Sequence, residues 1–123
     1  GLSQYLEVLT SSFDAQKGKE AFYHGFVLGL TATLTGDYRI RSNRESGFGR
    51  YDIAAFPRKA GERGMVIECK QAESENALET KAQEALEQIK ARDYDAEFRA
   101  QGVENVLHYG ISFCGKHVHV EMV

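Results

Sequence analysis

Three charged residues interrupt two segments of the sequence that are otherwise apolar, as buried strands are. Asp52 lies within residues 50–56, and Glu68 and Lys70 lie within residues 65–70. Because side chains alternate along a strand, Glu68 and Lys70 should share one face, while the residues on either side of Glu68 turn into a core. The short connection between the two segments favours antiparallel pairing, which would place Asp52 beside Glu68, directly or diagonally.

Two neighbouring carboxylates repel each other, and burial makes their ionised forms still less favourable. A divalent cation resolves this conflict, and Mg²⁺ prefers carboxylate and carbonyl oxygens while it keeps several waters. We therefore expect Asp52 and Glu68 to hold Mg²⁺, which Mn²⁺ can replace, with the backbone carbonyl of Cys69 as a further ligand. Lys70 would then meet the attacking water or the scissile phosphate and stabilise developing charge.

The elements that must position these residues follow from the hydrophobic periodicity. Apolar residues recur every four positions within residues 16–35, which predicts a helix, and a second long helix is expected over residues 75–92. Residues 95–101 either extend that helix or form a short separate piece. Alternating or apolar runs predict strands at residues 38–41, 50–56, 65–70, 106–113 and 117–122.

The order of these elements predicts the fold class. A short helix is expected at residues 4–9, within an N-terminal segment 1–15, and a polar loop at residues 43–49. The order is then α-α-β-β-β-α-β-β. Because a helix separates the third strand from the fourth, part of the sheet should be parallel. The expected fold is α/β, with a mixed sheet flanked by helices.

Length and composition set the broad class of protein. The chain has 123 residues, which suits one domain, and its 42% hydrophobic content is typical of a folded, soluble protein. No apolar run approaches the roughly 20 residues of a membrane span, no secretory signal is visible, and two cysteines suit a reducing cytoplasm. The net charge of −3 gives no overall reason to expect nucleic acid. Because the chain begins with Gly1, we expect a domain excised from a longer protein.

The ordered set of motifs resembles a known superfamily. Asp52, followed by Glu68-Cys69-Lys70 at the end of an apolar strand, is similar to the motif of the PD-(D/E)xK nucleases, which have the restriction-endonuclease-like fold. Three further segments strengthen the likeness, which covers roughly residues 16–123; they are residues 47–52, 85–89 and 109–116. Together they resemble the PD-(D/E)xK family that follows AAA-type ATPase-like regions as a C-terminal domain.

The resemblance implies roles by position. Asp52 and Glu68 would be metal ligands and Lys70 the catalytic lysine. Glu20, in the first long helix, would match the superfamily's helical acidic residue that completes the metal site. Gln88 would match the glutamine in the helix after the lysine strand, with Tyr94 as its downstream tyrosine. Tyr51 stands where the motif commonly has proline.

Two further residues are candidates for substrate binding. Arg50 follows two glycines and could reach a phosphate, although a structural salt bridge is the simpler alternative. His24 lies one helical turn from Glu20 and shares its face, although histidines at such positions are more often packed or capping residues. Gln88 lies on a flank of the second long helix, off its apolar stripe, so it can face the edge of a cleft.

These observations lead to three functional hypotheses. The first is metal-dependent phosphodiester hydrolysis of nucleic acid, with DNA favoured by the resemblance. The second is a non-catalytic recognition or regulatory module that serves an ATPase-like region of the same chain, and the third is an enzyme acting on a small phosphate ligand. A purely structural domain has no need of clustered charges on an apolar strand, which favours the nuclease. Divalent-metal binding that depends on Asp52 and Glu68 would discriminate between the first two.

Overall fold

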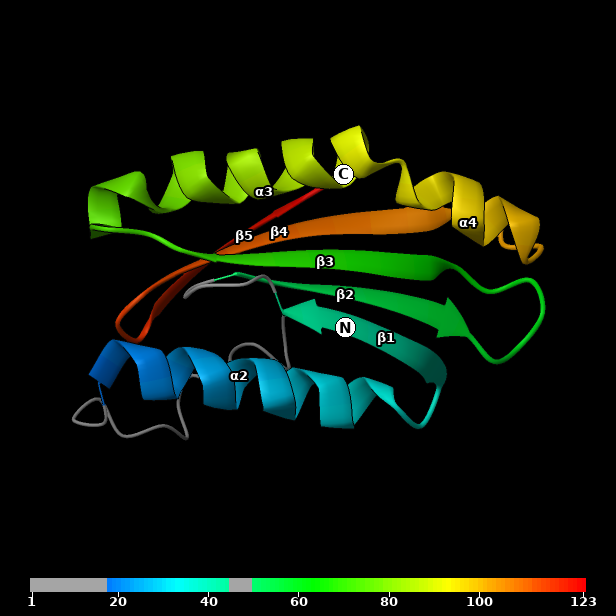
Figure 1. Ribbon diagram of the computed structural model, residues 1–123, viewed down its shortest axis with the longest axis horizontal. Coiled ribbons are helices and arrows are strands. Elements are labelled where there is room, and N and C mark those ends of the chain that lie inside the picture. The colour runs from blue at the N-terminus through cyan, green and yellow to red at the C-terminus, as the bar shows by residue number, and fades with distance from the viewer. Residues whose placement is uncertain (1–17, 45–49) are drawn as a thin grey trace.

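The computed structural model describes residues 18–44 and 50–123 (Figure 1). Its elements, in chain order, are α2 (Gly18–Leu34), β1 (Tyr38–Arg44), β2 (Arg50–Pro57), β3 (Gly64–Gln71), the 3₁₀ turn η2 (Glu75–Ala77), α3 (Leu78–Arg92), α4 (Tyr94–Ala100), β4 (Val106–Cys114) and β5 (His117–Met122). The strands form one five-stranded sheet in the order β1-β2-β3-β4-β5. Strands β3 and β4 run parallel, and the other neighbouring pairs are antiparallel. The predicted mixed sheet is therefore confirmed.

Helices cover both faces of the sheet, α2 on one side and α3 with α4 on the other (Figure 1). Period-two alternation divides the apolar residues of the strands between two cores. Ile67 and Phe113 pack with Phe26 of α2, whereas Val66 packs with Ile89 of α3. The α2 core also contains Cys69, so the expected inward orientation of the residues flanking Glu68 is confirmed.

The register of β2 against β3 sets the carboxylate pair. Asp52 lies directly opposite Glu68, and Arg50 lies directly opposite Lys70. Residues directly opposite each other project from the same face of a sheet. The strand that carries Glu68 also pairs with β4, where Gly110 is its partner.

Helix α3 lies unusually close to β4 at Gly110. A Cβ atom at that position would be 2.2 Å from the backbone oxygen of Ala82, so a residue with a side chain does not fit there without displacing the helix. One turn earlier, Ser112 Oγ donates a hydrogen bond to the carbonyl of Leu78 at 2.5 Å. These two contacts hold the helix backbone against the sheet on the face that carries Glu68.

Helices α3 and α4 are joined by Asp93, which has φ 50° and ψ 49°, in the left-handed region. Residues 94–100 therefore form the separate piece that the sequence left open, and the break places Arg92 and Tyr94 on either side of a sharp bend.

Strand β1 extends through Asn43 and Arg44, which the sequence had suggested as loop residues. The expected helix at 4–9 lies outside the described residues. In the described part of the chain, no helix is long and apolar enough to cross a membrane.

Candidate active site

The centre of the candidate site is the pair of opposed carboxylates on β2 and β3. Asp52 is 3% exposed and Glu68 is fully buried, and both project toward the α3 and α4 side of the sheet. Buried carboxylates are rare unless a cation or hydrogen-bond donors compensate their charge. The predicted juxtaposition of these two residues is what the sheet register produces.

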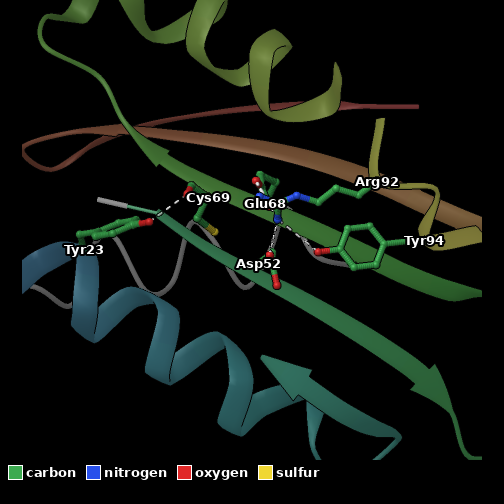
Figure 2. Close-up of polar contacts among 6 residues, drawn as sticks. All are labelled: Tyr23, Asp52, Glu68, Cys69, Arg92 and Tyr94. Atoms are coloured by element: carbon green, nitrogen blue, oxygen red, sulfur yellow. Dashed lines mark hydrogen bonds and ion pairs between the residues drawn. The ribbon is translucent and has the colours of Figure 1, made fainter. Parts of the chain in front are cut away.

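A cation from α3 reaches both carboxylates. Arg92 Nη1 lies 2.6 Å from Asp52 Oδ2 and 3.8 Å from Glu68 Oε1 (Figure 2). Sequence reasoning missed Arg92. One signal was available, because Arg92 lies four residues after Gln88 and therefore on the same flank of the helix.

Tyr94 joins the same cluster from the first residue of α4. Its hydroxyl accepts a hydrogen bond from Arg92 Nη1 at 3.4 Å, so the predicted downstream tyrosine contacts Arg92 (Figure 2). Burial raises the pKa of Tyr94, and the nearby Asp52 carboxylate raises it further, while Arg92 opposes the rise. The hydroxyl therefore remains protonated at neutral pH and can donate to a carboxylate or phosphate oxygen.

Gln88 provides a further oxygen on the flank of α3 that carries Arg92. Its Oε1 atom is buried and has no hydrogen-bond partner within the described residues. An unsatisfied buried amide oxygen costs free energy, so such an atom calls for a ligand or a water. This orphaned acceptor, together with two carboxylates, fits a hard divalent cation, which takes oxygen ligands and retains waters. No group of three or more His, Cys, Asp or Glu residues suited to a metal occurs in the described ranges.

Lys70 projects from the same strand face as Glu68, two residues further along β3, and is partly exposed. Arg50 lies opposite Lys70 in the register, but its side chain is outside the described part of the structure. The same holds for Glu20, which lies in the first turn of α2. The predicted roles of Arg50 and Glu20 stay predictions.

The carbonyl of Cys69, expected as a metal ligand, accepts a hydrogen bond from Tyr23 Oη at 2.9 Å (Figure 2). Burial raises the pKa of Tyr23 well above its usual range, which keeps its hydroxyl a donor. The Cys69 thiol is buried as well, and burial raises its pKa above the usual range.

His24 lies on the other side of the sheet. Its Nδ1 atom is 2.6 Å from Tyr51 Oη, and Tyr51 packs against the core under α2. Because Tyr51 precedes Asp52 in β2, their side chains point to opposite faces. The structure thus brings Asp52, Glu68, Lys70, Gln88 and Tyr94 to the α3 and α4 side, whereas the described contact of His24 is on the α2 side.

A comparison with protein families identifies the class. A family model of the PD-(D/E)XK nuclease superfamily matches residues 18–122, and the match includes every strand and helix described above. The chain belongs to this superfamily, and its sheet and flanking helices form the restriction-endonuclease-like α/β fold. No curated protein and no solved structure matches the sequence. Members of the superfamily are generally nucleases, and they typically use divalent metals.

Proposed function

We propose that this domain hydrolyses phosphodiester bonds of nucleic acid with a divalent metal ion, and that DNA is its substrate. The observation that carries the proposal is the direct pairing of Asp52 with Glu68 on one sheet face, with Lys70 two residues further on that face. The resemblance of Asp52, Glu68 and Lys70 to the motif of this superfamily, whose members are generally nucleases, supports the proposal.

The residues of the site have separate tasks in this reaction. Asp52 and Glu68 would hold the ion, with Gln88 Oε1, the Cys69 carbonyl and the Glu20 carboxylate as further oxygens. When bound, Mg²⁺ or Mn²⁺ supplies a more acidic water and neutralises charge on the phosphate. Lys70 orients the attacking water and stabilises the negative charge that develops on the phosphate oxygens.

Local positive charge supports a nucleic acid partner despite the net charge of −3. Arg39 and Arg41 are exposed on β1, and the register places both on the sheet face that carries Asp52. Their guanidinium carbons lie 5.2 Å and 5.7 Å from the centroid of the Phe56 ring. Arg41 also forms an ion pair with Glu97, and Arg39 donates a hydrogen bond to Gln101. The remaining N–H groups of the two guanidinium groups could contact a phosphate backbone that approaches the carboxylate pair. Arg50 of β2 and Tyr94 of α4 would contribute to substrate binding as well.

We also propose that the domain works beside an AAA-type ATPase-like region of the same chain, as the resemblance implies, and that it does so in the cytoplasm, which its two cysteines suit. The alternative is a non-catalytic recognition or regulatory module. One observation favours it, because the contact of Arg92 with both carboxylates gives them a counter-charge without a metal.

A nuclease assay separates the two functions. Labelled DNA and RNA are incubated with the protein and Mg²⁺ or Mn²⁺, and cleavage is followed for the wild type, Lys70→Ala and Lys116→Ala. Lys116 is an exposed lysine in the turn between β4 and β5, and it controls for the loss of one charge. We expect Lys70→Ala to abolish cleavage and Lys116→Ala to retain it. Cleavage by Lys70→Ala at the wild-type rate would contradict the assignment.

A further inference from the structure

Arg92 combines a contact to the centre of the site with access to solvent. Its guanidinium contacts Asp52 and Glu68, whose side chains are 4% and 0% exposed, while 31% of the Arg92 side chain is exposed. The arginine therefore bridges the buried pair and the surface. A long side chain in this position can leave the carboxylates without crossing packed core.

The helix that carries Arg92 ends at this residue. Arg92 is the last residue of α3, and Asp93 follows in the left-handed conformation. Strained backbone of this kind tends to occur at functional sites. Tyr94, on the other side of the bend, contacts the same Nη1 atom. The bend thus aims two side chains at Asp52.

A divalent ion and Arg92 compete for the same oxygens. Carboxylate ligands of Mg²⁺ lie about 2.0–2.1 Å from the ion, and Arg92 Nη1 already lies 2.6 Å from Asp52 Oδ2. Two cations on one carboxylate oxygen repel each other strongly in a poorly solvated site. The buried carboxylate pair needs a positive charge nearby both with and without the metal. When the Arg92 side chain leaves, the carboxylates are therefore uncompensated and can bind the divalent ion.

We propose that Arg92 is the resident counter-cation of the Asp52–Glu68 pair and that it is displaced when a divalent ion binds. This inference rests on the metal site of the proposed function. It means that Arg92 stabilises the metal-free domain and weakens its affinity for the metal. A purely structural arginine would have the first effect without the second.

The test compares Arg92→Gln with Lys90→Gln, a change of the same charge two residues earlier on α3 at an exposed position. Mn²⁺ binding is measured by calorimetry, and melting temperature is measured in EDTA and in Mn²⁺. We expect Arg92→Gln to bind Mn²⁺ more tightly than the wild type by about fivefold or more, as for other coupled ligands. Its melting temperature in EDTA should fall by about 5 °C, and Mn²⁺ should raise it by more than in the wild type. Lys90→Gln should match the wild type in both measurements.

Each outcome decides the inference. If the wild type binds Mn²⁺ and Arg92→Gln binds it equally or less tightly, Arg92 is not a competitor, and the metal site of the proposed function stands. If no variant binds Mn²⁺, both the competition and the metal site are wrong. If Arg92→Gln fails to fold, Arg92→Met replaces it, because methionine keeps an apolar stem that can pack at this position but removes the positive charge. An unchanged Mn²⁺ affinity in Arg92→Met would then overturn the inference.

Discussion

Asp52 has two alternative positively charged partners, the arginine that contacts it and the ion that we propose it binds. We expect Asp52→Asn to abolish measurable Mn²⁺ binding, because an amide oxygen is a weaker ligand than a carboxylate and one charge of the pair is lost. Calorimetry checks this prediction. Asp37→Asn, at an exposed turn before β1, makes the same change of charge and should bind Mn²⁺ like the wild type. Equal affinity in the two variants would place the metal elsewhere.

The raised pKa values of Cys69 and Tyr23 make the free energy of unfolding depend on pH. Burial raises the pKa of the Cys69 thiol and of the Tyr23 hydroxyl in the folded protein. Their contribution to stability is therefore complete below the unfolded-state values of about 8.5 and 10 and is lost as pH rises above them. We expect the free energy of unfolding in urea to fall between pH 8 and pH 11. Cys69→Ala should show a smaller decline over this interval, and an identical decline would contradict the role of the thiol.

Gly110 fixes the distance between α3 and the sheet. A Cβ atom there would meet the Ala82 backbone oxygen at 2.2 Å, so Gly110→Ala must displace the helix that carries Gln88 and Arg92. We expect a loss of about 1–3 kcal/mol in the free energy of unfolding, as for other overpacked sites, together with a loss of nuclease activity. Gly36→Ala is the control, since a Cβ atom at Gly36 would have nothing within 4 Å. Its stability should stay within about 0.5 kcal/mol of the wild type.

The strands and the α3–α4 junction show which parts of the structure could be predicted from the sequence. Alternation and apolar runs predicted every described strand, and Asp52 beside Glu68 followed from a short hairpin connection. The bend at Asp93 was not predictable, because no glycine or proline marks it and aspartate enters the left-handed region only in a suitable tertiary setting. The spacing of Arg92 from Gln88 indicated the flank of the helix but not its partner. Its contact with Asp52 depends on the path of the crossover between β3 and β4, which local patterns do not specify.

For the molecule as a whole, any affinity for nucleic acid must come from local charge, because the net charge is −3. We expect Arg39→Gln/Arg41→Gln to weaken DNA binding and to reduce the slope of log affinity against log salt by about 0.9 for each lost phosphate contact. Fluorescence anisotropy over a range of salt concentrations measures both quantities. The double variant Lys59→Gln/Lys116→Gln is the control, because it removes the same two positive charges at exposed positions outside β1. It should leave the slope unchanged, and equal slopes in the two double variants would exclude β1 as the contact surface.

The parallel pairing of β3 with β4 also determines when the site is completed during folding. Asp52 and Glu68 meet as soon as β2 and β3 form their hairpin, a local event that closes a short loop. Arg92 arrives only after the α3 crossover has docked, because it is 40 residues from Asp52 in the chain. The two carboxylates therefore face each other early without this arginine. Docking of α3 then relieves their repulsion, so we expect assembly of the proposed catalytic centre to depend on the long-range crossover rather than on the local hairpin.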